Sequence, residues 1–238
     1  MTLAPHSQSH IDRPSTAVDN VIFSVIDNDL HVLLVKRGEV PFPKEWSIVG
    51  GFVDTHKDND LEATAQRKLI EKTGISAPYL EQFKTIGSAN RDPRCWSITT
   101  IYFSLLPFSE LKPTDEHVEA AQWFKLEEAI NMPLAFDHAE ILKDCADRLR
   151  SKVLYTSLPV HLMPETFTLS ELQKVYETII GETIDQKSFR RRILNTDILI
   201  ETDMTKQTSK RPAKLYIRNP ELDTHFFTRN IEGPNRQN

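Results

Sequence analysis

The chain contains 238 residues, of which 39% are apolar and 26% are charged. This composition is typical of a globular protein, and the length suits two domains of roughly 100–150 residues each. No apolar stretch approaches the ~20 residues needed to cross a bilayer. The first residues, MTLAPHSQSHIDRPS, lack the basic and then apolar pattern of a signal peptide. Residues 1–17 are therefore expected to form a flexible arm of a cytoplasmic protein.

Charged residues are distributed unevenly along the chain. The formal net charge is −5, but residues 152–238 contain 13 Lys and Arg against 11 Asp and Glu, whereas residues 1–151 contain 16 against 23. A basic C-terminal part beside an acidic N-terminal part agrees with a polyanion partner for the C-terminal part. Cys95 and Cys145 are isolated thiols without a CxxC pair, and they predict neither a zinc site nor a disulfide.

Residues 18–155 alternate between short β-rich runs and helical patterns. The runs 21–26 and 31–36 flank the turn signal Asp27-Asn28-Asp29 and predict a hairpin. Segment 60–73 has an apolar stripe at four-residue spacing and is followed by Gly74, which predicts a helix with a glycine stop. Further strands are expected at 46–49, 83–88, 98–106 and 121–124, and further helices at 126–131 and 137–153.

Residues 156–165 include two prolines and are expected to form a linker. With this linker included, the second domain is expected to span residues 156–238. Thr168 and Glu171 have capping-box spacing, so a helix is expected at 169–180. A second helix is expected at 185–195. Two short strands, 198–202 and 213–218, then enclose the polar and basic loop 203–212.

The segment GGFVDTHKDNDLEATAQRKLIEKTGI, residues 50–75, resembles the Nudix box. That pattern is Gly, five residues, Glu, seven residues, Arg-Glu, an apolar residue, any residue, Glu-Glu, any residue and Gly. Aligned from its C-terminal end, the segment retains Arg67, Glu71 and Gly74. The loop after Gly51 carries two extra residues. Three of the family's acids are replaced, by Asn59, Lys68 and Lys72.

The replacements matter because positions 68, 71 and 72 share one face of a helix. In active members this face holds Mg²⁺ through carboxylates, and the metal activates water and neutralises the pyrophosphate. One carboxylate between two ammonium groups repels a divalent cation, so we expect no metal site and no catalytic residue. An i,i+4 ion pair with Arg67 is the favoured role for Glu71. The alternative is a metal site rebuilt from other acids, namely Asp54, Asp58, Asp60, Glu62, Glu116 and Glu119.

The resemblance to the Nudix family extends beyond the box. Segments 46–53, 87–94 and 134–138 look like the ADP-ribose-type branch of the family, which implies a nucleotide pocket. Arginine suits diphosphate through charge-assisted bonds, lysine could meet phosphate directly, and an aromatic ring could stack on adenine. For Trp46 and His138 the alternatives are core packing and a first-turn position in a helix. The candidate ligand-binding residues are Arg37, Trp46, Gly51, Phe52, Lys68, Glu71, Lys72, Arg91 and Arg94.

The helix expected at 185–195 has two chemically different faces. Phe189 and Ile193 lie on one face at i,i+4 spacing, whereas Lys187 and Arg191 lie on the opposite face with Arg190 beside them. Such a helix can present cations to the major groove of DNA, and the basic loop that follows can act as a wing. The candidate DNA-binding residues are Lys187, Ser188, Arg190, Arg191, Lys206, Lys210 and Arg211.

Residues 167–177 and 189–193 also resemble the winged-helix end of the Nudix-related transcriptional regulators of NAD metabolism. The implied fold is α+β, a Nudix α/β/α sandwich with a mixed sheet followed by a winged helix-turn-helix domain. The implied function is that of a repressor of NAD-metabolism genes. It would bind operator DNA as a homodimer and sense ADP-ribose or a related nucleotide as effector, without a cofactor.

The sequence leaves two other functions open. One is an active ADP-ribose pyrophosphatase with an accessory domain, which Mg²⁺-dependent turnover would reveal. The other is a nucleotide-binding scaffold whose basic C-terminal domain binds protein. Steep salt dependence of binding to duplex DNA separates that scaffold from a DNA-binding protein.

Overall fold

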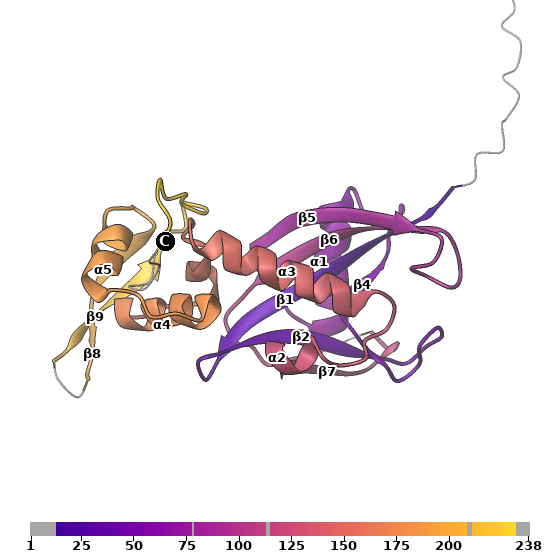
Figure 1. The fold of residues 1–238 in the computed structure, drawn as a ribbon, viewed down its shortest axis with the longest axis horizontal. Helices are drawn as coiled ribbons and strands as arrows, with labels where there is room; N and C mark the ends of the chain where they lie inside the picture. The colour runs from indigo at the N-terminus through magenta and orange to yellow at the C-terminus, as the bar shows by residue number, and fades with distance from the viewer. Residues whose placement is uncertain (1–12, 78, 113–114, 209–210, 232–238) are drawn as a thin grey trace, which may run out of the picture.

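The computed structural model describes residues 13–77, 79–112, 115–208 and 211–231. Two units lie side by side along the long axis of the molecule (Figure 1). The larger unit contains a mixed sheet and its covering helices, and the smaller unit contains two helices and a two-stranded hairpin. The fold is α+β, as the sequence predicts.

The sheet of the larger unit is built around β1 (Ser15–Ile26). This strand pairs in parallel with β6 (Ser97–Leu105), and antiparallel with β2 (Asp29–Arg37) and β4 (Val49–Phe52). Antiparallel pairing adds β5 (Tyr79–Ser88) beside β6, and β3 (Trp46–Ser47) and β7 (Val118–Lys125) beside β2. The predicted hairpin is therefore the β1–β2 pair, and the sheet is mixed.

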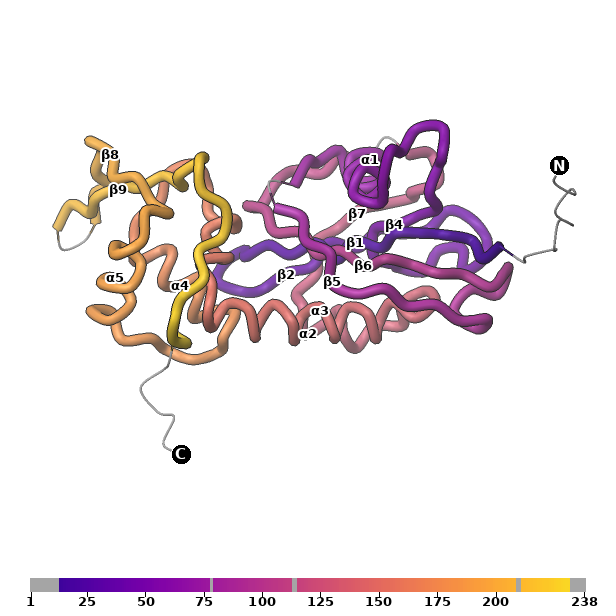
Figure 2. Tube along the Cα trace, turned by 90° about the horizontal axis from the view of Figure 1, so that it is seen from above, coloured from indigo at the N-terminus to yellow at the C-terminus, as the bar shows by residue number. Residues whose placement is uncertain are grey.

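Helices cover both faces of this sheet, which gives a sandwich. Figure 2 shows α1 (Leu61–Thr73) on one side and α2 (Leu126–Ala129) and α3 (His138–Val153) on the other. Successive residues of a strand point to opposite faces. Accordingly Ile22 packs in the cluster that contains Leu69 of α1, whereas Phe23 packs in the cluster that contains Leu149 of α3.

β1 and β5 begin at least four residues earlier than the sequence predicts. β1 starts at Ser15 instead of residue 21, so it takes the last three residues of the expected arm into the sheet. Its first half was missed because buried polar residues interrupt the apolar pattern, including Asn20, which donates a hydrogen bond to the carbonyl of Ala65. β5 starts at Tyr79 instead of 83, and its apolar signal is weak because it lies at the sheet edge and carries exposed polar side chains.

The smaller unit has the predicted order of helix, helix, strand, loop and strand. It contains α4 (Leu169–Ile180), α5 (Gln186–Leu194), β8 (Leu199–Lys206) and β9 (Ala213–Arg218). The Thr168–Glu171 capping box is present, and Asp185 caps α5 by accepting from the N–H of Ser188. β8 ends four residues later than predicted, so the hairpin loop is correspondingly shorter. β8 and β9 project from the body (Figure 1).

The segment expected to be a linker is part of the core instead. Residues 156–163 are buried, and Leu158–Leu162 form a short 3₁₀ helix, η1, with Pro159 in its first turn. The two prolines suggested a spacer, but the apolar run Leu-Pro-Val-His-Leu buries itself between the two units. One continuous apolar cluster consequently extends from Phe23 and Leu149 through Val160 to Tyr176 and Phe189.

Residues after β9, for which the sequence predicts no element, fold back onto the end of α3. The backbone N–H groups of Ser157, Phe227 and Ile231 form hydrogen bonds to the carbonyls of His225, Tyr155 and Leu154, respectively. Ile231 is buried in the shared cluster. Among the described residues, no helix has both the length and the apolar character that crossing a membrane requires.

His161 of η1 makes the joint between the units sensitive to acid. Its ring lies 4.7 Å from that of Tyr79, and neither ring nitrogen has a hydrogen-bond partner among the described residues. Burial lowers the pKa of His161 from 6.5 to about 4. The unfolded chain therefore takes up a proton below pH 6.5 that the folded chain does not accept until about pH 4.

We therefore expect the free energy of unfolding to decrease as the pH falls from 6.5 to 4. His161→Phe keeps the aromatic contact and removes the titration, so its stability should decline less over this range, by about 3 kcal/mol. Urea unfolding of both proteins at several pH values measures the difference. Parallel stability curves would contradict this origin of the acid sensitivity.

Candidate nucleotide pocket and DNA-facing surface

A pocket of about 900 Å³ opens at the end of the larger unit where β2, β4 and the N-terminus of α3 meet. Its walls come from β1, β2, β4 and α1, from the β5–β6 loop and from the residues that precede β7. Eight of the nine candidate ligand-binding residues line it: Arg37, Gly51, Phe52, Lys68, Glu71, Lys72, Arg91 and Arg94. The sequence motifs that seemed separate thus converge on a single cavity.

Trp46 is the exception among the nine. Its ring packs edge-to-face on Phe124 at a centroid distance of 4.8 Å, and it is not one of the residues that line the pocket. This position is the core packing that was the alternative for Trp46. The aromatic residues that do line the pocket include Phe52 and Phe136.

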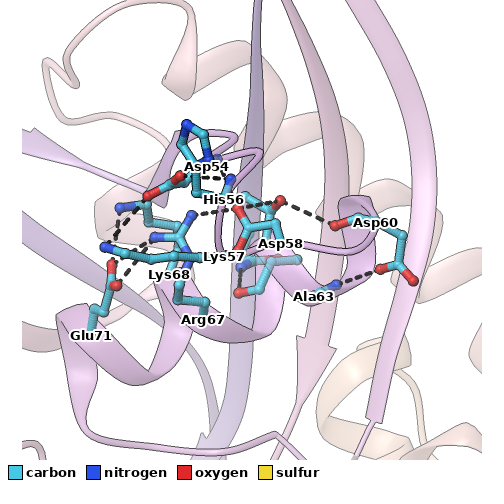
Figure 3. Close-up of polar contacts among 12 residues, drawn as sticks. Asp54, His56, Lys57, Asp58, Asp60, Ala63, Arg67, Lys68 and Glu71 are labelled. Atoms are coloured by element: carbon cyan, nitrogen blue, oxygen red, sulfur yellow. Dashed lines mark hydrogen bonds and ion pairs between the residues drawn. The ribbon is translucent and has the colours of Figure 1, made fainter.

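Helix α1 presents the charged face of the Nudix box to the pocket (Figure 3). It begins at the cap Asp60, which accepts from the N–H of Ala63, and it ends at Gly74 with φ of 74°. Glu71 accepts hydrogen bonds from Arg67 at 3.1 Å and from Lys68 at 2.9 Å. Burial alone would raise the pKa of Glu71, but these two cations hold it below its usual value.

Asp58 is the main partner of Arg67, a pairing that the sequence pattern did not predict. Its carboxylate accepts from Arg67 Nε at 2.6 Å and from Thr64 Oγ1 and the backbone N–H of Asp54 at 2.9 Å. The Arg67 guanidinium holds the pKa of Asp58 far below its ordinary value. Asp58 thereby fixes the loop between β4 and α1, which carries the two extra residues, against α1 (Figure 3).

The Mg²⁺ that active Nudix proteins hold does not fit this donor set. Glu71, the one carboxylate among positions 68, 71 and 72, already neutralises two cations, and Lys68 and Lys72 flank it. In the part of the chain that the structure describes, no cluster of three or more His, Cys, Asp or Glu side chains could hold a metal ion. The acids considered for a rebuilt site include Asp58, which is occupied by Arg67.

Two pocket cations differ from the others because no carboxylate of the described residues forms an ion pair with them. Arg37 donates to the carbonyls of Pro41 and Glu39, and burial together with the nearby Arg94 lowers its pKa. Lys72 is half-buried, and burial lowers its pKa as well. A buried cation without a counter-ion is costly. The pocket is therefore electrostatically prepared for an anionic ligand.

Aromatic rings and arginines alternate along one wall of the pocket. The Arg94 guanidinium lies 5.0 Å from the centre of the Phe52 ring, and the Arg37 guanidinium lies 4.8 Å from the centre of the Phe136 ring. Phe136 itself has φ of 59°, a left-handed conformation that is costly for a residue with a side chain. This wall offers flat apolar faces next to positive charge, which suits a nucleotide base beside its phosphates.

Arg91 and His138 take structural positions within the pocket wall. Arg91 is nearly buried and donates to both carboxylate oxygens of Asp137 at 3.0 Å and to Asp19 at 3.2 Å. It therefore joins the β5–β6 loop to the start of α3. His138 accepts the N–H of Ile48 at its Nδ1, and burial lowers its pKa. Its position in the first turn of α3 is the one expected.

Sequence reasoning missed several pocket residues. Asp19 was overlooked because the start of β1 was not recognised, and Asp92 because its role is to bind Arg94 across a loop, at 2.7 Å. Phe136 stands within the segment 134–138 that resembles the family pattern, but nothing in the sequence indicated its backbone conformation. The contacts of Asp19 depend on tertiary structure, whereas the Asp92–Arg94 pair is local and depends on the conformation of the loop.

In the smaller unit, α5 has one buried apolar face and one exposed basic face, as the sequence predicts. Phe189 and Ile193 are buried, and the Phe189 ring packs edge-to-face on Tyr176 at 5.1 Å. Lys187, Ser188, Arg190 and Arg191 are exposed on the helix. Arg192 points elsewhere, because it donates to the carbonyl of Asn230 at 2.7 Å and lies over the ring of Phe227. The exposed cations of α5 form one outward surface.

The β8–β9 hairpin contributes the predicted wing residues. Arg211 is exposed, whereas Lys206 forms an ion pair with Glu171 at 2.6 Å. Lys210 lies outside the described residues. The Lys206 pair connects the wing to the first turn of α4, so a DNA phosphate would have to compete with Glu171 for this ammonium.

Comparison with known proteins agrees with both halves of the chain. A model of the NUDIX domain matches residues 16–145, and a model of the NrtR DNA-binding winged helix domain matches residues 159–217. A protein of Acinetobacter baylyi named ADPR responsive transcriptional repressor NtrR is 46% identical over 214 residues, which are 90% of this chain and 86% of that protein.

The chain belongs to the NrtR family.

Solved structures of this family support the assignment. The crystal structure of Shewanella oneidensis NrtR in complex with a 27mer DNA aligns over 91% of this chain and 99% of that chain, with a TM-score of 0.83 and 40% identity. The Nudix domain of the same protein in complex with ADP ribose aligns over 61% of this chain and 94% of that domain, with a TM-score of 0.58 and 37% identity. Both units of the NrtR architecture are therefore present.

The role of Asp58 can be tested by Asp58→Asn, which leaves Arg67 with Glu71 as its charged partner. Removing a charge-assisted pair with a nearly inaccessible carboxylate should lower the free energy of unfolding by about 1–3 kcal/mol, as measured with urea. Asp54→Asn is the control, because Asp54 is in the same loop but is more exposed and pairs with the exposed end of Lys57 at 3.4 Å. Equal effects of the two substitutions would refute a special role for Asp58.

Proposed function

We propose that the chain is a repressor of NAD-metabolism genes, which binds operator DNA through its winged-helix unit and senses ADP-ribose or a related NAD-derived nucleotide in its Nudix unit. The observation that carries this proposal is the union, on one chain, of a pocket rich in cations and a helix with an outward basic surface. The names of the relatives from Acinetobacter baylyi and Shewanella oneidensis support it.

The Nudix unit acts as a receptor and does not hydrolyse its ligand. Pyrophosphate cleavage in this fold depends on carboxylate-bound metal, and α1 presents Lys68 and Lys72 where active members have glutamates. The nucleotide would place its diphosphate near Arg37 and Lys72 and its base against the wall formed by Phe52 and Phe136. Binding energy is then available to change the conformation of the protein.

Two elements connect the pocket to the DNA-binding unit. β2 has Arg37 in the pocket at one end, and at the other end the β1–β2 turn accepts a hydrogen bond from Thr178 of α4 at Asn28. α3 has His138 in the pocket wall, and its last residues lead into buried η1. At the standard rise per residue, β2 is about 30 Å long and α3 is about 24 Å long. A ligand that prefers one arrangement of their ends changes operator affinity by linkage.

The active form is a homodimer on a near-palindromic operator. A single winged helix buries too little surface for tight and specific binding, and two copies at matched half-site spacing provide the remainder. Nucleotide binding would change the relative position of the two α5 helices so that they no longer fit successive half-sites.

Replacing Arg190 and Arg191 with Ala should weaken operator binding by about 10–100-fold and reduce the slope of log affinity against log salt by about one for each phosphate that is no longer neutralised. The reason is the removal of two exposed cations from the surface of α5. Fluorescence anisotropy at several salt concentrations measures both quantities. Lys174→Ala on the exposed side of α4 is the control, and an unchanged double variant would exclude α5 as the reading helix.

Saturating ADP-ribose should lower operator affinity at least about tenfold, which corresponds to a coupling free energy near 1.4 kcal/mol. The same protein preparation should not consume ADP-ribose in the presence of Mg²⁺, as followed by chromatography of the nucleotide. Rapid metal-dependent turnover would favour the alternative of an ADP-ribose pyrophosphatase. Equal operator affinity with and without nucleotide would contradict the repressor mechanism.

A further inference from the structure

Lys68 and Lys72 stand one turn apart on α1, and both line the pocket. They occupy two of the positions from which carboxylates hold Mg²⁺ in active Nudix proteins, as the box alignment shows. This face of α1 has therefore lost metal ligands and has also gained cations. Positive charge is present at the place where the metal would supply it.

The backbone of β4 accommodates Lys68. A Cβ atom added to Gly51 would lie 2.9 Å from Cε and 3.0 Å from Cδ of Lys68, so the lysine stem lies directly against this glycine. The ammonium is then held by Glu71 at 2.9 Å, and 18% of the side chain is exposed. The close approach and the ion pair give the Lys68 ammonium a defined place in the pocket wall (Figure 3).

Lys72 differs from Lys68 in its surroundings. It is half-buried, and the structure gives it no ion pair among the described residues. The charged groups that influence it include the carboxylates Asp115 and Asp19 and the cations Lys68 and Arg37. Because these opposite charges surround it without forming an ion pair with it, its ammonium can still compensate a ligand's negative charge.

We propose that the ammonium groups of Lys68 and Lys72 take the place of the metal ion, so that the pocket binds the diphosphate of its nucleotide without any divalent cation. The proposal builds on the nucleotide-sensing function above and adds its electrostatic mechanism. Two lysines supply the charge that a diphosphate requires, and Arg37 is a further cation that lines the same cavity. Divalent cations, which neutralise the free nucleotide, then compete with the protein for the diphosphate.

The full-length protein should bind ADP-ribose in EDTA at least as tightly as in Mg²⁺, as measured by isothermal titration calorimetry. Affinity that increases tenfold or more on adding Mg²⁺ would overturn the proposal. Inorganic pyrophosphate is the second probe, because it carries the diphosphate without the adenosine and ribose. Binding of pyrophosphate in EDTA supports the proposal even if ADP-ribose is not the effector, whereas failure to bind either probe would remove both inferences.

The double variant Lys68→Met/Lys72→Met keeps the approximate length of both stems and removes both charges. Removal of each charge-assisted hydrogen bond should weaken affinity for ADP-ribose in EDTA by about 10–100-fold. Lys57→Met is the matched control, since Lys57 lines the same pocket but its side chain is 64% exposed and pairs with Asp54. Unchanged affinity of the double variant, or an equally large decrease in the control, would overturn the proposal.

A cooperative thermal transition and retained operator binding without nucleotide establish that the double variant is folded. The charge-reversal variant K68E/K72E provides a second measurement. It places three carboxylates on one face of α1 and should abolish binding of both probes in EDTA. Retained binding would show that the diphosphate does not contact this face.

Discussion

Apolar packing along α3 determines where the two candidate sites lie relative to each other. The helix begins in the wall of the pocket with His138, packs Leu149 against the sheet and ends where η1 enters the smaller unit. Because the core continues through Val160 to Phe189, the helix that presents Arg190 and Arg191 is set on the same apolar cluster as the sheet that carries the pocket. A loose linker would have left the two sites independent, whereas this packing places them at opposite ends of shared elements.

The chemistry of the pocket follows from one helical turn of α1. Positions 68, 71 and 72 must share a face, so their side chains decide together whether the face attracts a metal or an anion. Glu71 is paired with both Arg67 and Lys68, so the cations on this face of α1 outnumber its one carboxylate. The function proposed above therefore assigns recognition without hydrolysis to a fold that elsewhere supports catalysis, since function depends on the residues at the site and not on the fold.

Local chemistry made much of this structure predictable. The glycine stop of α1 and the capping box of α4 were predictable because each depends on residues that are close in the sequence, and the two faces of α5 followed from helical periodicity. The pairs Arg67–Asp58 and Arg91–Asp137 were not visible, because folding brings their members together from a loop and from distant elements. Burial of η1 was missed for a similar reason, since prolines mark irregular backbone but do not tell whether it is exposed.

The residues after β9 give α5 a second attachment to the larger unit. Arg192 contacts Asn230 and Phe227, and the same segment pairs its backbone with Tyr155 and Leu154 at the end of α3. The rotation of α5 about its own axis is thus restrained from two sides. Phe189 packs beneath the helix, and residues 225–231 contact it through Arg192. A small rotation at the end of α3 would therefore reach α5 through these contacts and would turn its exposed cations, Lys187, Arg190 and Arg191, while the smaller unit stays folded.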